Sequence, residues 1–195
     1  MAELGLTAEP GFLLLMAALY YLGGGAAATA FFAAALAHEL GHLTVLWLLG
    51  ASVQELRLQW TGLVIRYTGA LTPRQEAGTA LAGPAAGLLF SLGCALSDRP
   101  YFHYAGAIAI LASAFNLLPC LPMDGGRAAL YIFADVMPER TARRVLRVLG
   151  TLCALGVTAT GIAIRVPTAV AAGIWMCALA NSSDLLYNRS HENER

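Results

Sequence analysis

Three residues that lie close together in the sequence have types and spacing that could hold and use a metal ion. They are His38, Glu39 and His42, which form an H-E-x-x-H pattern. On a helix, positions i and i+4 lie one above the other, so both imidazoles can reach one ion. Zinc favours such nitrogen ligands, and catalytic zinc takes three protein ligands and a water. Glu39 is then expected to act as the general base that takes a proton from that water.

The H-E-x-x-H pattern lies in an apolar segment of a chain that is apolar throughout. Of its 195 residues, 58% are hydrophobic and 12% are charged, whereas about 25% are charged in soluble domains. This composition predicts a membrane protein. The net charge of zero gives no global field that would attract nucleic acid. Ionisable side chains at membrane depth cost several kcal/mol unless paired, protonated or metal-bound, so the location favours a metal site over polar contacts between helices.

A third ligand is needed, and Asp124 is the carboxylate in the most suitable position. It follows an apolar segment at a point where prolines and glycines interrupt the helical pattern. Non-helical backbone at membrane depth is tolerated only where it lines protein or a wet cavity. The alternative is an ordinary loop carboxylate that caps the helix after it. Three other carboxylates fit the ligand role less well. Asp98 is expected on the opposite side of the membrane, and Glu55 and Glu76 flank a predicted β-hairpin.

Helices that cross the bilayer must position these residues, and each needs about 20 mostly apolar residues. Six segments qualify, at 9–25, 27–49, 77–96, 102–119, 145–163 and 166–183. Between the second and third, apolar and polar residues alternate around Gly62, which predicts a β-hairpin over 53–67. The expected fold class is an all-α polytopic membrane protein with about six transmembrane helices. A short cytoplasmic β-hairpin lies between the second and third of them.

The arginines predict the orientation, because positive charges concentrate on the cytoplasmic side. An even number of spans places both termini on one side, and all the arginines except Arg99 and Arg165 fall there. We therefore expect a multi-pass cell-membrane protein with cytoplasmic termini and an active site toward the cytoplasm. A basic helix from Pro138 is expected to bind anionic headgroups. The organisation expected is one transmembrane domain over 1–187 and a polar tail over 188–195, with no cleavable signal peptide.

Three separated motifs resemble, in order and spacing, those of the site-2 protease family of intramembrane zinc metalloproteases. They are His38–His42, Ala82-Gly83-Pro84 after the helix start at Thr72–Glu76, and Asn116–Pro119 followed by Pro122–Arg127. The compact branch without a PDZ domain, which includes sporulation-factor processing proteases, is the most similar. The resemblance implies one zinc ion per chain held by His38, His42 and Asp124, with Glu39 as general base. It also implies regulated intramembrane proteolysis, the hydrolysis of peptide bonds in membrane-anchored substrates.

Two positions depart from the family's pattern. Met123 stands where many members have leucine, which is a mild apolar change, and Gly87 stands where many have asparagine. The second change removes a polar neighbour of the site. We interpret Gly83 and Gly87 as a G-x-x-x-G pair that packs helices closely. Asn116 is a candidate for a hydrogen bond to substrate or to the oxyanion, and equally for packing between helices.

Two other functions stay open on the sequence. A protease fold without activity could be a metal-binding membrane scaffold, and the same histidines and acid could carry a metal ion in a transporter. The expected partners are a membrane-anchored protein substrate and the lipid bilayer, and not nucleic acid. The predicted hairpin could bind an unwound substrate as an added strand or act as a passive interfacial lid. A regulatory membrane protein and a homo-oligomer are left open.

Overall fold

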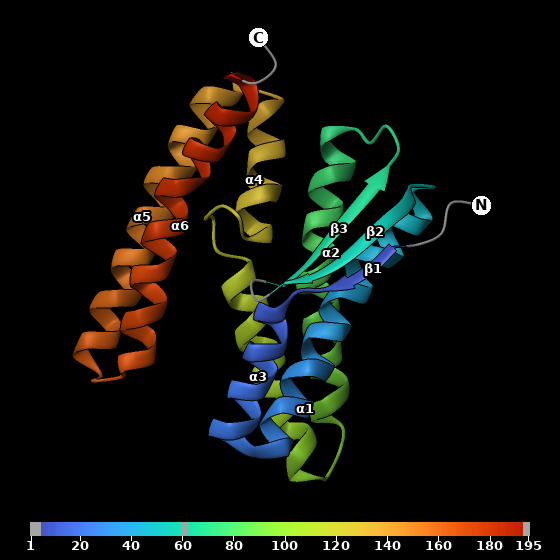
Figure 1. Ribbon diagram of the computed structural model, residues 1–195, viewed down its shortest axis with the longest axis vertical. Helices are drawn as coiled ribbons and strands as arrows, with labels where there is room; N and C mark the ends of the chain where they lie inside the picture. The colour runs from blue at the N-terminus through green and yellow to red at the C-terminus, as the bar shows by residue number, and fades with distance from the viewer. Residues whose placement is uncertain (1–4, 60–61, 193–195) are drawn as a thin grey trace. The chain divides into compact units, whose positions relative to one another are not determined.

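A computed structural model describes residues 5–59 and 62–192 of the chain, which form two compact units, 1–114 and 115–195 (Figure 1). The turn of the predicted hairpin, at Trp60 and Thr61, lies outside the described residues. The first unit contains β1 (Gly5–Ala8), α1 (Pro10–Leu48), β2 (Ser52–Gln59), β3 (Gly62–Thr68), α2 (Pro73–Ala95) and most of α3 (Pro100–Asn116). The second contains the end of α3, α4 (Asp124–Ala134), α5 (Glu139–Ala163) and α6 (Pro167–Glu192).

Three of the described helices, α1, α2 and α5, are long and apolar enough to cross a membrane. The prediction of a membrane protein is therefore confirmed. The helix α3 has 17 residues, fewer than the about 20 that a span needs. The apolar part of α6 within the described side chains is Pro167–Asn181. The count of six spans stays a prediction.

Helix α1 reverses its direction at Gly24, where φ is 74° and ψ is 178°. A straight helix of its 39 residues would extend about 58 Å. Yet β1, which precedes α1, pairs in parallel with β2, which follows it, and places Ala8 opposite Leu58. The chain must therefore turn back within α1, and Gly24 provides the turn (Figure 1).

The two arms of α1 differ in length. The predicted break between the first two apolar segments is confirmed, because Gly24 separates an arm over 10–23 from an arm over 25–48. At 1.5 Å per residue the first arm extends about 21 Å, which is less than the about 30 Å of a bilayer's hydrocarbon core. The second arm is long enough to cross, and it carries the H-E-x-x-H motif.

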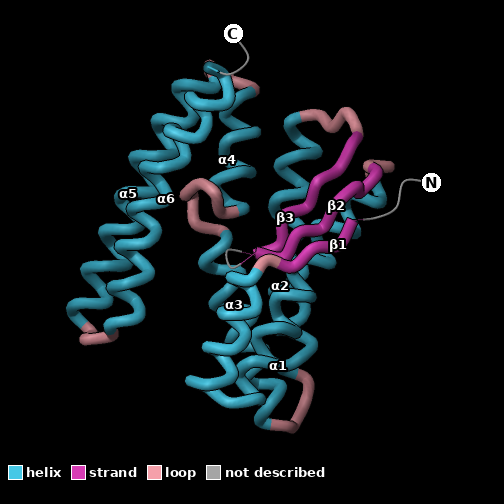
Figure 2. The backbone as a smooth tube through the Cα atoms, in the orientation of Figure 1, coloured by secondary structure: helices cyan, strands magenta, loops and turns pink. Residues whose placement is uncertain are grey.

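Strands β2 and β3 form the antiparallel hairpin that the alternation predicted (Figure 2). Leu56 pairs with Ile65 and Leu58 with Leu63, and one irregularity lies between Val53 and Glu55. The sequence analysis missed β1, which adds in parallel to the other edge of β2 and gives the order β1-β2-β3. Its four residues are too few to show a period of two. The all-α class is therefore corrected to a mostly helical protein with a small three-stranded sheet.

Helix α2 begins as the sequence predicts and packs on α1. The Thr72 hydroxyl accepts a hydrogen bond from the Gln75 N–H at 3.3 Å, and the Gln75 side chain accepts one from the Thr72 N–H at 2.8 Å. Pro73 follows as the first helical residue, so the capping box is confirmed. Farther along, the buried positions of α2 recur every three or four residues and include Ala80, Gly83, Gly87, Ser91 and Cys94.

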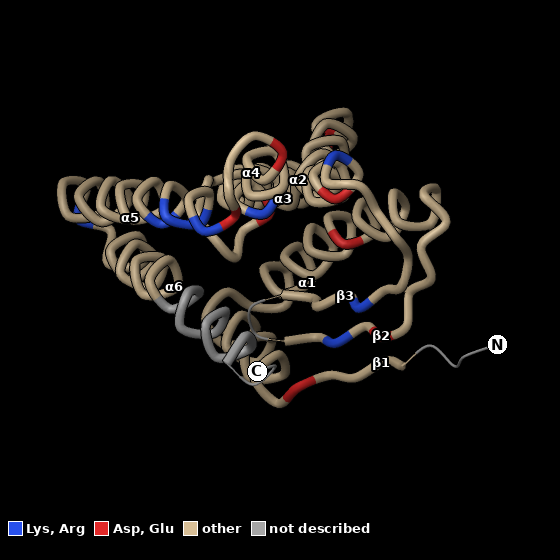
Figure 3. The backbone as a smooth tube through the Cα atoms, turned by 90° about the horizontal axis from the view of Figure 1, so that it is seen from above, with Lys and Arg blue, Asp and Glu red and all other residues tan. Residues whose placement is uncertain are grey.

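The second unit is a helical hairpin, α5 and α6, with α4 packed against α5. Its core combines side chains of the loop before α4 with those of α5 and α6, namely Cys120, Met123, Ala154, Met176 and Ala180. Helix α5 runs without interruption from Glu139 to Ala163. The predicted helix after Pro138 and the predicted span over 145–163 are therefore one helix, with basic residues along its first turns (Figure 3).

Replacing Gly24 with alanine is expected to destabilise the protein by about 1–3 kcal/mol, because side chains rarely adopt its φ of 74° with an extended ψ. Gly25→Ala is the matched control. Its new Cβ would lie 3.6 Å from the nearest side-chain atom, Cε2 of Tyr20, which is an ordinary contact. Thermal unfolding in detergent micelles measures both variants. Equal melting temperatures would show that the reversal does not depend on a glycine.

Candidate metal centre and active site

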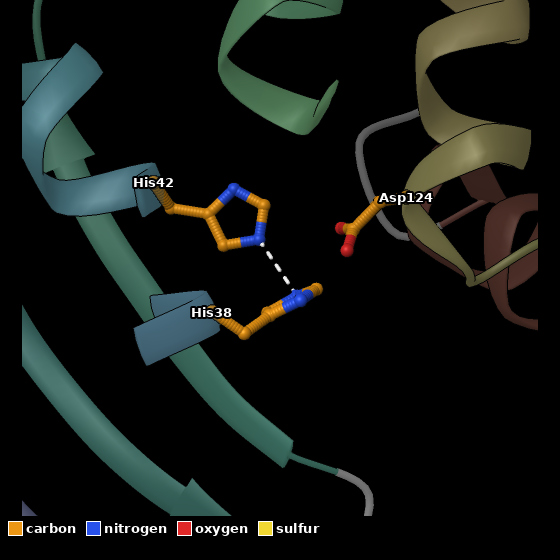
Figure 4. Close-up of side chains that lie close together, drawn as sticks. All are labelled: His38, His42 and Asp124. Carbon is orange, nitrogen blue, oxygen red and sulfur yellow. Dashed lines mark hydrogen bonds between the residues drawn. The ribbon is translucent and has the colours of Figure 1, made fainter. Parts of the chain in front are cut away.

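The second arm of α1 brings His38 and His42 together, as their spacing predicts. The Nε2 atoms of the two imidazoles are 3.2 Å apart, and the ring centroids are 4.9 Å apart with the rings edge to face (Figure 4). Both side chains are buried, at 8% and 7% exposure. Two histidines so placed in an apolar helix require a polar partner for their nitrogens.

The separation of the two Nε2 atoms fits a shared zinc ion. Zinc–nitrogen bonds are about 2.0–2.1 Å, so two ligands at a tetrahedral angle lie about 3.3 Å apart. The 3.2 Å between Nε2 of His38 and Nε2 of His42 is close to this value. The donor set, two buried imidazoles on one helix face, is also the type that zinc prefers. The residues present therefore fit a zinc site.

A main-chain carbonyl of α2 orients His42. Nδ1 of His42 lies 2.7 Å from the carbonyl oxygen of Thr79. A carbonyl can only accept, so Nδ1 carries the proton and donates it to this hydrogen bond. The lone pair of the neutral ring is then on Nε2, the nitrogen that faces His38. Hydrogen bonds of this kind fix the tautomer and the ring orientation of histidine ligands in metal sites.

Glu39, the predicted base, lies between the two histidines in sequence and faces the sheet. Its Oε1 accepts a hydrogen bond from the main-chain N–H of Leu63, at 3.4 Å. Leu63 is the second residue of β3, so the beginning of that strand lies beside the carboxylate. Glu39 is partly buried.

Asp124 belongs to the second unit, where it is the first residue of α4 and is buried at 8% exposure. One of its carboxylate oxygens, Oδ1, lies 3.8 Å from Nη1 of Arg127. The next two residues have no room for a side chain. A Cβ on Gly125 would meet the carbonyl oxygen of Leu117, and one on Gly126 would lie 2.5 Å from the main chain of Cys120. The preceding loop therefore lies directly on the start of α4, where Asp124 is the first residue.

Two of the other carboxylates considered as third ligands, Glu55 and Glu76, have partners of their own. Glu55 pairs with Arg57 at 2.8 Å and with Arg66 at 3.5 Å, and the hydrogen bond from Arg57 lowers the pKa of Glu55. Glu76 accepts a hydrogen bond from the hydroxyl of Tyr67. Glu55 therefore stabilises the sheet, and Glu76 stabilises the connection between the sheet and α2.

Asn116 is the last residue of α3 and is partly buried. Its contact with a substrate stays a prediction, as does the role of Asp124 as a ligand. Thr79 was missed, because it acts through its main-chain carbonyl, and a carbonyl gives no residue-type signal. Gly83 was interpreted only as a packing residue, although its Cα faces the two imidazoles.

No protein-family model matches the chain. Two curated relatives carry provisional names as zinc metalloproteases. Rip3 of Mycobacterium tuberculosis is 32% identical over 158 residues, which are 74% of this chain and 40% of that protein. The Synechocystis protein sll0528 is 34% identical over 104 residues, which are 48% of this chain and 27% of that protein. The chain thus spans less than half the length of these relatives.

A solved structure shares the fold. The site-2 protease from Methanocaldococcus jannaschii matches with a TM-score of 0.68 over 91% of this chain and 90% of that chain, at 19% identity. Relatives named as zinc metalloproteases, the shared fold and the paired histidines beside Glu39 agree with the three sequence motifs. The chain belongs to the site-2 protease family of membrane zinc metalloproteases.

Proposed function

We propose that this protein is an intramembrane zinc metalloprotease that hydrolyses peptide bonds of membrane-anchored protein substrates within or next to the bilayer. One observation carries the proposal. The Nε2 atoms of His38 and His42 converge to 3.2 Å beside Glu39, on a helix that is long and apolar enough to cross a membrane. Ionisable side chains in an apolar helix cost free energy unless they are hydrogen-bonded, paired or metal-bound, so two buried imidazoles that face each other favour a metal site over simple packing.

One zinc ion per chain is held by His38, His42 and Asp124, the side chains drawn in Figure 4. Support for Asp124 comes from its burial, its position as the first residue of α4 and its place in the motif that resembles the family's. Two imidazoles and one carboxylate are a common ligand set of catalytic zinc sites. When bound, zinc would act as a Lewis acid that polarises the scissile carbonyl and makes water nucleophilic near neutral pH.

Glu39 acts as the general base and then as the general acid. Its carboxylate takes a proton from the water that adds to the carbonyl carbon of the scissile bond. It gives that proton to the nitrogen of the leaving group as the C–N bond breaks, which leaves a carboxylate and an amine. The hydrogen bond from the Leu63 N–H keeps the Glu39 carboxylate beside β3.

The edge of β3 that is away from β2 binds the unwound substrate as an added strand. β2 is paired on both sides, by β1 and by β3, so it has no edge to offer. The N–H of Leu63 points away from β2, since it donates to Glu39. With a period of two, the N–H of Ile65 faces the same way. A segment that pairs with this edge would lie beside the proposed base.

The protein is multi-pass, with both termini and the active site toward the cytoplasm of the cell membrane. The pairing of β1 with β2 supports this topology, because it places residues 5–8 on the same side as the β2–β3 hairpin. The basic first turns of α5, with Arg140, Arg143, Arg144 and Arg147, suit a cytoplasmic surface of anionic headgroups. Asn116 hydrogen-bonds to the substrate or to the developing oxyanion.

Glu39→Gln is expected to retain zinc and to lower cleavage by about 10²–10⁴-fold, because glutamine cannot accept the proton. The measurement is proteolysis of membrane-anchored candidate substrates by purified protein, with zinc quantified in wild type and variant. Zinc retention with loss of cleavage supports the role of Glu39. Zinc in both proteins with no cleavage by either would favour the metal-binding scaffold, and zinc-dependent ion flux in vesicles would favour the transporter.

Asp124→Ala is expected to weaken zinc binding by more than about 100-fold, because loss of a direct ligand costs more than loss of an outer hydrogen-bond partner. Competition with a chromophoric chelator measures the affinity. Asp98→Ala is the control, since Asp98 lies in the α2–α3 connection. If both variants bind zinc as the wild type does, Asp124 is not a ligand.

Ile65→Pro is expected to lower kcat/KM by about 2- to 10-fold, the effect of one lost main-chain hydrogen bond. Proline removes an N–H on the open edge of β3 and leaves the bonds between β2 and β3 in place. Ile65→Ala keeps the N–H and shortens the side chain, so it separates the two contributions. If the alanine variant loses as much as the proline variant, the side chain and not strand addition accounts for the loss.

A further inference from the structure

The Ala82-Gly83-Pro84 motif has no part in the chemistry proposed above, yet it lies on the face of α2 that packs on α1. Gly83 and Gly87 form a G-x-x-x-G pair on this helix, and both are buried. Such pairs commonly let helix backbones approach each other. In this protein the two glycines face different groups, and only one of them faces the histidines.

Gly83 has no room for even a methyl group. A Cβ at this position would collide with Nε2 of His42, and it would lie 2.6 Å from Cε1 of His42 and 2.7 Å from Nε2 of His38. Real Cβ atoms essentially never come within 3.0 Å of a heavy atom from another part of the structure. The atoms that it would meet belong to rings that cannot simply move aside, since Nδ1 of His42 is held at 2.7 Å by the Thr79 carbonyl.

Gly83 and Thr79 are one helical turn apart, so a single turn of α2 constrains His42 in two ways. The Thr79 carbonyl fixes which ring nitrogen is protonated, and the bare backbone at Gly83 limits where the ring can lie. Helix α1 also approaches α2 closely at a glycine of its own. A Cβ on Gly41, which lies between Glu39 and His42 in α1, would meet the Ala82 carbonyl oxygen and lie 2.6 Å from the Ala86 Cβ.

We propose that Gly83 is a positioning residue of the metal centre. Its Cα packs against the imidazoles of His38 and His42 and limits where the two rings can lie, so that their Nε2 atoms converge on one ion. This inference deepens the proposed function and rests on it for the identity of the ion. The contact between Gly83 and the two rings exists whether or not the protein is a protease.

Gly87 provides the matched control, because its close neighbour is a hydroxyl away from the histidines. A Cβ there would meet Oγ of Ser113, and the next nearest atom is 3.7 Å away. Gly87→Ala together with Ser113→Ala removes this one conflict. The double variant therefore changes the same G-x-x-x-G pair, in the same helix, without touching the metal centre.

Zinc affinity is the first measurement. Gly83→Ala is expected to raise the Kd for zinc by at least about tenfold, the usual effect of disturbing the groups that orient metal ligands. The Gly87→Ala/Ser113→Ala variant is expected to bind zinc as the wild type does. Cobalt substitution adds a spectroscopic readout, because a displaced imidazole changes the d–d absorption. Unchanged affinity and spectrum in Gly83→Ala would overturn the proposal.

A double-mutant cycle of melting temperatures, measured on the metal-free protein, separates positioning of the histidines from general helix packing. Gly83→Ala is expected to lower the melting temperature of the metal-free protein in the wild-type background. It is expected to cost much less in a His38→Ala/His42→Ala background, where the rings that it meets are gone. Equal losses in both backgrounds, or failure of Gly83→Ala to fold in a His38→Ala/His42→Ala protein that itself folds, would show that Gly83 contributes to helix packing alone.

This cycle distinguishes the two levels of inference. If the wild type binds no zinc, the proposed function fails, yet coupling between Gly83 and the two histidines would still establish the contact. If the wild type binds zinc and cleaves substrate while the cycle shows no coupling, only the role of Gly83 fails.

Discussion

The close approach of α1 and α2 is the constraint on which the candidate metal centre depends. In lipid, helices gain little from the hydrophobic effect, so they associate through packing and hydrogen bonds, and small residues at the interface let the backbones come close. Here each helix presents a glycine to the other, Gly41 from α1 and Gly83 from α2. At this spacing the Thr79 carbonyl reaches the ring of His42 at 2.7 Å. A wider gap would leave the buried Nδ1–H of His42 without this acceptor, at a cost of about 1–3 kcal/mol.

The small sheet ties the ends of this arrangement together. β1 and β2 are attached to the two ends of α1 and pair with each other, so the reversal at Gly24 is closed by main-chain hydrogen bonds. β3 extends the same sheet and reaches Glu39 through the N–H of Leu63. The paired histidines, the proposed base and the open strand edge therefore all come from one stretch of chain, between β1 and α2. The metal centre proposed here adds a carboxylate, Asp124, from the beginning of the second unit.

Features with a local, periodic signal could be predicted from the sequence. The i, i+4 spacing of His38 and His42, the capping box at Thr72 and Gln75 and the alternation in the β2–β3 hairpin all appear in the structure as expected. Other features depend on contacts between distant parts of the chain. β1 is too short to show alternation and is recognised only by its pairing with β2, about 50 residues later. The Thr79 carbonyl, 37 residues from His42 in sequence, gives no signal in its side chain. Gly83 acts through the absence of a side chain, and only the structure shows that the rings of His38 and His42 occupy the space this leaves.

β1 also determines which strand edge of the sheet is exposed to other chains. β2 carries apolar residues at Leu56 and Leu58, and β1 covers the edge of this strand that β3 does not. An exposed edge of that kind is a template for pairing with another chain. Removal of the residues before Pro10 would replace the four-residue edge strand β1 with the eight-residue strand β2 at this edge of the sheet. Shortened forms of the protein would then be more prone to edge-to-edge aggregation, even though every residue of the candidate metal centre is retained.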